Sequence, residues 1–301
     1  MKKLFLSLLI PALAVSAFSQ NAFQTEAILA KEGGENFQAL ILAATATGIR
    51  YKTSADTANF TDAKISDFTA IFLKEPGEFS EAMDLYEARK YKEAQAKFAE
   101  VKEFYKPIAT LKDNHHTLAA FYEMECMRKQ GDLDGLAAAL QTFIKAPLGR
   151  DHQLRQLDLY IMWDAVRSLS WDRVLLIASG RDEESLPGYQ RAQVAYCKGL
   201  ALQNMERGAE AIISYSVAMT ADAGASERIA EDAALNALRV YHADKEVQTA
   251  IEVWGTDDEN KSSGGYTRLT EAAALAAFYD KVLKVGKPLP AELAEFLKYG
   301  A

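Results

Sequence analysis

The spacing of apolar residues after residue 79 constrains the fold of this 301-residue chain more than any other feature. From Phe79 onward, apolar residues recur every three or four positions, which is the period of one face of an α-helix. The helical segments come in pairs joined by turns, and the second segment of each pair starts with an equivalent apolar anchor. The anchors are Ala94, Leu136, Val174, Ala211 and Val247, at intervals of 42, 38, 37 and 36 residues. Because a helical hairpin covers its second apolar face only by stacking on the next hairpin, the pattern predicts one continuous array.

The first of these units resembles the tetratricopeptide (TPR) repeat. It has a small residue, Ala82, before a turn, and then Tyr91, Ala94, Phe98 and a terminal Pro107. The fourth unit matches the same pattern, the third and fifth diverge from it, and the intervals slightly exceed the family's length of about 34 residues. The resemblance implies a mainly α fold, a TPR-like α-solenoid of about five helical hairpins over residues 78–301.

Residues 37–75 follow a different pattern. Short β-branched and aromatic runs at 37–42, 48–53 and 64–73 are separated by turn residues, which favours a small antiparallel sheet of three to five strands. The Pro76-Gly77 step that follows is a strong breaker and separates this segment from the first helix. We therefore expect a small β domain, SH3-like or a partial barrel, before the helical repeats.

Residues 1–19 have the features of a secretory signal peptide. Two lysines precede an apolar run, residues 4–15, which ends in small residues. The run is shorter than the roughly 20 residues that span a membrane, and Pro11 interrupts it. We expect cleavage, no transmembrane segment in the mature chain, and a periplasmic or secreted protein, with association with the outer membrane left open. The order of signal peptide, β segment and helical hairpins resembles exported bacterial TPR proteins.

The charge balance limits the partners. The formal net charge of −8 becomes about −10 when the two lysines of the signal peptide are removed. Nucleic acids and anionic lipid surfaces reward a basic patch, so we expect no nucleic-acid partner. Nothing in the sequence indicates an oligomeric state.

The residues that commonly carry chemistry are sparse. No phosphate-binding loop, dinucleotide-binding turn, nucleophile elbow or His-Glu-x-x-His motif occurs in the sequence. His116 and Glu123, two turns apart on one predicted helix face, form the best candidate metal pair, but two ligands do not make a zinc site. Cys126 and Cys197 lie in helices two repeats apart, farther than the roughly 4.4–6.8 Å Cα separation of a disulfide, so we expect two buried free thiols. We expect no catalytic residue, metal or cofactor, and hence no enzyme.

The resemblance also implies where a binding groove would lie, because the first helix of each TPR hairpin lines the concave face. The groove positions carried onto this sequence are Tyr86 in the first unit, Phe121 and Arg128 in the second, Trp163 and Arg167 in the third, Tyr196 and Asn204 in the fourth, and Asn236 and Arg239 in the fifth. Aromatic and Arg side chains dominate binding hot spots. The same rings fill the core equally well in divergent repeats.

These observations predict a non-enzymatic exported scaffold or adaptor that binds a protein or peptide partner in the cell envelope. An alternative is a protein that binds a carbohydrate or a peptidoglycan fragment and stacks sugars on the same rings. A third reading, a hydrolase without a recognisable motif, requires two carboxylates facing each other across a pocket.

Overall fold

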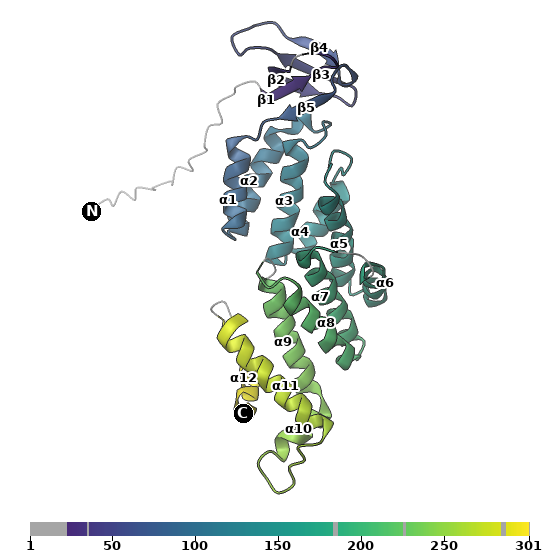
Figure 1. Ribbon diagram of the computed structural model, residues 1–301, viewed down its shortest axis with the longest axis vertical. Helices are drawn as coiled ribbons and strands as arrows, with labels where there is room; N and C mark the ends of the chain where they lie inside the picture. The colour runs from purple at the N-terminus through teal and green to yellow at the C-terminus, as the bar shows by residue number, and fades with distance from the viewer. Residues whose placement is uncertain (1–22, 35, 183–185, 225–226, 284–286, 301) are drawn as a thin grey trace, which may run out of the picture.

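The computed structural model describes residues 23–34, 36–182, 186–224, 227–283 and 287–300, and it is mainly helical with a small antiparallel sheet at one end (Figure 1). The predicted signal peptide, residues 1–19, lies outside the described residues. Among the residues that are described, no helix is both long enough and apolar enough to cross a membrane.

The sheet has five strands in the order β4-β3-β2-β1-β5, and all neighbours are antiparallel. The strands are β1 Thr25–Ala30, β2 Phe37–Ala44, β3 Gly48–Lys52, β4 Thr61–Lys64 and β5 Ala70–Leu73. A 3-10 turn, Ile65–Asp67, separates β4 from β5. The expected range of 37–75 omits β1, although β1 is the strand that joins β2 to β5. The SH3-like or partial-barrel assignment stays a prediction.

One face of the sheet is buried and the other is partly open. Ala27, Leu29 and Ile41 point to the buried face, where β2 contacts the 3-10 turn Lys106–Ile108 of the helical part. On the opposite face, Ile28 is 44% exposed. The sheet is therefore anchored to the helices by one face, and β4 and β5 are its two edges in the described part of the chain.

Ten helices follow as five antiparallel hairpins, and a C-terminal cap completes the described chain. The hairpins are α1 Gly77–Glu87 with α2 Tyr91–Phe104, α3 His115–Gln130 with α4 Leu133–Thr142, α5 Asp151–Arg167 with α6 Trp171–Asp182, α7 Gly188–Asn204 with α8 Gly208–Ala221, and α9 Glu227–Ala243 with α10 Lys245–Glu252. The cap consists of α11 Gly264–Phe278, a π-helical turn Tyr279–Leu283, α12 Ala291–Ala294 and a 3-10 turn Glu295–Tyr299.

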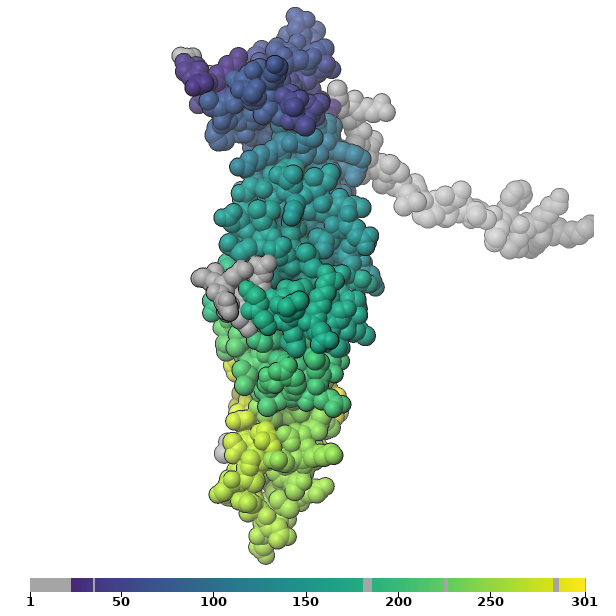
Figure 2. Space-filling model, turned by 90° about the vertical axis from the view of Figure 1, so that its right-hand side faces the viewer, coloured from purple at the N-terminus to yellow at the C-terminus, as the bar shows by residue number. Residues whose placement is uncertain are grey.

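Helices that are consecutive in the sequence pack against each other, and first helices also contact first helices, as α5 contacts α7 and α7 contacts α9. The result is a long body with the sheet at one end and the C-terminal helices at the other (Figure 2).

The turn between α3 and α4 shows why these residues break the helix. Gly131 adopts the left-handed conformation, with φ of 79°, which ends α3 at low steric cost. Asp132 then caps α4, because its side chain accepts a hydrogen bond from the Gly135 N–H at 2.9 Å.

All five predicted anchors are in the second helices of the hairpins and are buried. Ala94, Val174, Ala211 and Val247 are 0% exposed and Leu136 is 1% exposed. Each stands in the first turn of its helix. The register predicted from the apolar spacing is therefore confirmed at the level of burial. Cys126 and Cys197 are both buried and free, as expected.

Candidate functional site

Three of the nine predicted groove residues meet in one cavity, Arg128 from α3, Trp163 from α5 and Tyr196 from α7. The cavity, called here the inner pocket, measures about 300 Å³. Its lining residues are Arg89, Tyr91, Arg128, Lys129, Gly131, Leu133, Trp163, Val166, Tyr196, Leu200, Glu227, Arg228, Ile229 and Asp232. The first helices of four successive hairpins, α3, α5, α7 and α9, contribute to it, so it lies on the inner side of the array.

The floor of the inner pocket rests on a buried ion pair. Arg128 donates to both carboxylate oxygens of Glu125, at 3.0 and 2.7 Å, and both side chains are less than a tenth exposed. The Tyr160 hydroxyl donates to the same carboxylate at 2.5 Å and the Tyr86 hydroxyl at 3.4 Å. Burial opposes ionisation of Glu125, but Arg128 and the hydrogen bonds outweigh it and lower the pKa of this carboxyl. Arg128 is thus locked in one position by its partners.

Two aromatic side chains form the apolar wall. The rings of Trp163 and Tyr196 have their centroids 5.9 Å apart at a tilt of 37°. The Trp163 indole N–H donates to Gln193 Oε1 at 2.9 Å. Burial raises the pKa of Tyr196, whose hydroxyl accepts from Asn236 Nδ2 at 3.4 Å. These contacts hold both rings in fixed orientations.

The rim is built where the start of α9 approaches the first two hairpins. Arg89 forms an ion pair with Glu227 and donates to the Gly224 carbonyl oxygen at 3.1 Å. Arg228 donates to the Lys129 carbonyl oxygen at 2.8 Å. These contacts join parts of the chain that are about a hundred or more residues apart in the sequence, so they close the inner side of the array around the pocket.

Lys129 adds a cation beside two rings. Its Nζ lies 5.7 Å from the centroid of Tyr86 and 5.4 Å from that of Tyr91, within the range of cation–π contacts. Burial, together with the neighbouring Arg128, lowers the pKa of Lys129. Elsewhere on the rim, burial raises the pKa of Asp232 despite Arg228 at 3.6 Å.

The other six predicted residues do not line the inner pocket. Tyr86 supports it through Glu125, and Phe121 is a core residue that packs on Tyr160. Asn236 and Arg239 are linked to its wall, since Arg239 donates to Asn236 Oδ1 at 2.6 Å and Asn236 in turn to Tyr196.

Arg167 and Asn204 are exposed residues near the C-terminal ends of α5 and α7. Arg167 pairs with Asp164 and Asp134, and Asn204 donates to the Leu200 carbonyl oxygen of its own helix. The repeat pattern assigned both residues to the groove. Their side chains instead contact neighbouring residues outside the inner pocket.

Sequence reasoning missed the residues of the rim. Arg89, Lys129 and Arg228 lie in or next to turns between helices, and the apolar period carries no information about turns. Gln193 was also missed, because glutamine is usually a surface residue and nothing in the local pattern marks it as a partner for Trp163.

The candidate metal pair has other partners. His116 Nδ1 is 2.7 Å from the Lys102 carbonyl oxygen, and Glu123 forms an ion pair with Lys102 at 2.7 Å. In the described ranges, no group of three or more His, Cys, Asp or Glu side chains lies close enough to hold a metal ion.

A larger cleft of about 1100 Å³ lies between the sheet and the first helices, and none of the nine predicted residues lines it. The inner pocket is the candidate site because four hairpins converge on it with rings and charges in fixed positions. Aromatic walls and fixed charges suit binding of a side chain or small ligand.

No protein-family model matches the chain, and neither a curated protein nor a solved structure matches it significantly.

Proposed function

We propose that the protein is a non-enzymatic exported scaffold or adaptor of the TPR-like class, which binds a protein or peptide partner in the cell envelope along the inner side of its helical hairpins. The observation that carries the proposal is the convergence of Arg128, Trp163 and Tyr196, from three consecutive first helices, on the inner pocket. Export rests on the signal-peptide pattern of residues 1–19.

The size and wall of the inner pocket favour one large side chain of a partner. A volume of about 300 Å³ is at the lower end of the range for ligand sites. Trp163, Val166 and Leu200 offer an apolar surface, and charged groups surround it. Hot spots of protein interfaces combine a desolvated aromatic centre with a polar rim in the same way.

The carbohydrate alternative fits this geometry less well. A sugar stacks on an exposed ring face, whereas Trp163 is only 8% exposed and its indole N–H is already bonded to Gln193. Binding of a peptide requires only that one side chain of the partner enters the inner pocket next to Trp163 and Tyr196.

The proposal is tested by capture of partners from an envelope extract with the mature protein, followed by mass spectrometry. Leu200→Arg fills the inner pocket from its half-buried wall and should abolish retention of the captured partner. Arg167→Ala and Asn204→Ala, at exposed positions outside the pocket, are the matched controls and should retain it.

Variants of the two rings separate binding from folding. Removal of an interface hot spot typically costs about 2 kcal/mol of binding free energy, roughly a thirtyfold loss of affinity. Because Trp163 is buried, Trp163→Ala should also lower stability by about 3–5 kcal/mol, while Tyr196→Ala is the milder change. If folded Leu200→Arg and Tyr196→Ala proteins hold the partner as tightly as the parent does, the binding surface lies elsewhere.

A further inference from the structure

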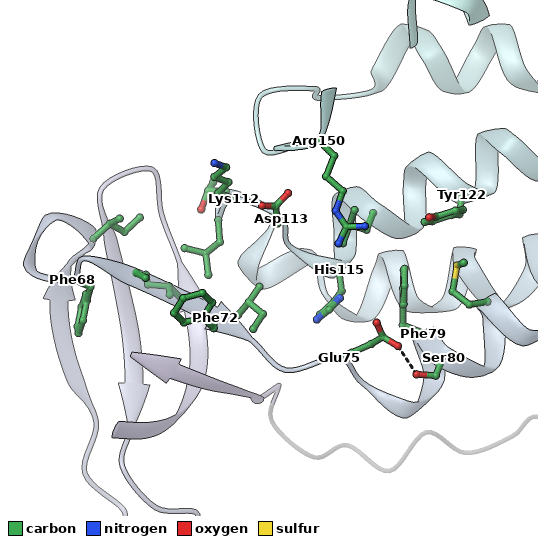
Figure 3. Close-up of a pocket in the computed structure, with 18 of the residues that line it drawn as sticks. Phe68, Phe72, Glu75, Phe79, Ser80, Lys112, Asp113, His115, Tyr122 and Arg150 are labelled. Carbon is green, nitrogen blue, oxygen red and sulfur yellow. Dashed lines mark hydrogen bonds between the residues drawn. The ribbon is translucent and has the colours of Figure 1, made fainter. Parts of the chain in front are cut away.

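The strand β5 is an edge of the sheet, and its outer side opens into the cleft of about 1100 Å³. All six residues from Phe68 to Leu73 line this space, here called the edge cleft. Figure 3 shows two of them, Phe68 and Phe72. The far wall is the face of α1 that carries Phe79 and Met83, together with Leu118 and Tyr122 of α3. An edge strand beside an apolar wall is the arrangement that receives an added strand.

The hydrogen-bonding direction of β5 follows from its register with β1. The Lys74 N–H donates to the Glu26 carbonyl oxygen at 2.9 Å, and Phe72 is opposite Ile28. Because bonded residues alternate in an antiparallel pair, the N–H and C=O groups of Phe72 face β1, and those of Ile71 and Leu73 face the edge cleft. Two donors and two acceptors of the main chain are thus available to a partner strand.

The outer face of the sheet offers a second surface beside the same edge. Phe72 is 59% exposed and Ile28 is 44% exposed, and they lie opposite each other on neighbouring strands. They contribute to a hollow of about 600 Å³ on this face. Side chains of a strand alternate between its two faces, so an added strand would place one set over Phe72 and the other toward the helices.

A positive charge in the edge cleft indicates the chemistry of the occupant. Figure 3 shows the Arg150 side chain reaching into the cleft from the start of α5, above His115. In the part of the chain that the structure covers, no ion pair or hydrogen bond engages its guanidinium. Four described carboxylates also line the cleft, and no ion pair joins any of them to Arg150. Glu75 accepts from the Ser80 hydroxyl and Asp113 from the Gly149 N–H, while Asp84 and Glu87 belong to α1. An exposed Arg without a carboxylate partner is suited to a bidentate carboxylate ligand.

We propose that the edge cleft is a second binding site, in which an extended peptide segment of a partner protein pairs with Ile71 and Leu73 of β5 and places an Asp or Glu side chain on Arg150. The site is separate from the inner pocket, and it does not depend on the function proposed for that pocket.

Peptides for the test come from a random dodecapeptide library displayed on phage and selected against the full chain. Enriched sequences should contain an acidic residue within a run of β-branched or aromatic residues. A synthetic peptide of the enriched sequence, labelled for fluorescence anisotropy, is the probe in all later measurements.

Two variants and their matched controls test the contacts. Ile71→Pro removes an N–H that faces the cleft and leaves the bonds to β1, since Pro is tolerated on the outer side of edge strands. It should weaken binding of the peptide about tenfold or more, as should Arg150→Gln. Ile71→Val keeps the N–H, and Lys112→Gln removes a neighbouring exposed cation of the cleft, so both should bind within about a factor of two of the parent.

A second measurement covers the case in which Ile71→Pro does not fold. N-methylation of the peptide at single positions, with the unmodified protein, should abolish binding at alternate residues only, because only every second N–H of an added strand points to β5. Replacing the acidic residue of the peptide by its amide should have the same effect as Arg150→Gln.

The proposal is overturned if no sequence is enriched, if N-methylation is tolerated at every position, or if Ile71→Pro binds as the parent does. The proposal is also overturned if the peptide needs its C-terminal carboxylate and not its acidic side chain. In that case amidation of the C-terminus would abolish binding, and the occupant would be a chain end. Tyr196→Ala, which alters the inner pocket, should bind the peptide normally.

Discussion

At the scale of single residues, substitution of the buried carboxylate of Glu125 should cost the most stability. It accepts hydrogen bonds from Arg128, Tyr160 and Tyr86. Neither Glu125 nor Arg128 has appreciable contact with solvent. A buried charge is tolerated only with a partner, and removing that partner leaves the desolvation of the remaining ion uncompensated.

We therefore expect Glu125→Gln to destabilise the protein by about 3–5 kcal/mol, measured by urea unfolding, because it leaves the Arg128 guanidinium buried with a neutral partner. Glu210→Gln is the control, since Glu210 and Arg207 form an exposed pair at the start of α8 whose loss should hardly change stability. The double variant Glu125→Leu with Arg128→Met should recover much of the loss. A cost for Glu125→Gln no larger than that for Glu210→Gln would show that the pair is hydrated.

His115 connects the sheet to α3 and makes stability depend on pH. Burial lowers the pKa of its imidazole, against a smaller opposing effect of the Lys74 carbonyl oxygen, which is 3.1 Å from Nε2. The carbonyl oxygen only accepts, so Nε2 carries the proton of the neutral ring. The neutral form is thus the one that the folded state favours.

For a histidine whose folded pKa is below its unfolded value, stability is full above the unfolded pKa of about 6.5 and falls as the pH decreases toward the folded pKa. We expect the thermal midpoint of the parent to decrease between pH 7.5 and 5.5. His115→Phe keeps the ring contacts with Phe79 and Tyr105 and should show a smaller decrease. An equal decrease in both proteins would assign the effect to other groups, among them His152, whose pKa burial also lowers.

The buried glutamines mark the limit of sequence reasoning at this scale. Gln153, Gln156, Gln190 and Gln193 are between 0 and 2% exposed, on the facing helices α5 and α7. Gln156 and Gln193 bond each other at 2.9 and 3.1 Å. A helical wheel assigns glutamine to the solvent side, and only the facing helix reveals that the amides of Gln156, Gln190 and Gln193 have partners. The amide of Gln153 has no hydrogen-bond partner among the described residues. Arg128 was predicted at the groove, but its partner Glu125 was not, for the same reason.

At the scale of elements, the hairpins were predictable because each second helix repeats a small or branched anchor in its first turn, and burial of that anchor sets the register of the helix. The strand β1 was not predictable in the same way. It buries Thr25 and exposes Ile28, so at these two positions it departs from the usual alternation of a half-buried strand. Its place in the sheet depends on pairing with β2 and β5, which local sequence does not encode.

The packing of α7 on α8 depends on a glycine that no apolar pattern marks. A Cβ atom at Gly199 would lie 2.5 Å from Cε1 of Tyr215, a ring that is completely buried and has no space to move. Gly180 is also inside a helix, α6, but a Cβ atom there would meet nothing within 4 Å.

Alanine at the two positions should have opposite effects on the free energy of unfolding. Gly199→Ala should destabilise by about 1–3 kcal/mol through overpacking, even though alanine favours the helix. Gly180→Ala should stabilise by up to about 1 kcal/mol, because only the helix preference acts there. Urea unfolding of both variants checks this. Stabilisation by Gly199→Ala would mean that α7 and α8 are farther apart than described.

At the scale of the whole molecule, the buried residues form two clusters that share α9. The larger cluster runs from Ala27 in the sheet to Ala237, and the smaller one from Ala234 to Tyr299. In α9, Ala233 and Ala237 belong to the first cluster, and Ala234 and Leu238 to the second. Most contacts between elements join helices that are consecutive in the sequence, so the effect of a local change should decrease with distance along the chain.

This organisation predicts that the C-terminal end opens separately from the sheet. Leu269→Ala, at a completely buried position of α11, should cost about 2–5 kcal/mol locally. Hydrogen exchange should then accelerate in α9 to α12, while amides of the sheet and of α1 to α4 keep their protection, because they belong to the other cluster. Leu176→Ala, at a position of α6 that is 76% exposed, is the control and should change exchange nowhere. If Leu269→Ala accelerates exchange in the sheet as much as in α11, the two clusters unfold as one cooperative unit.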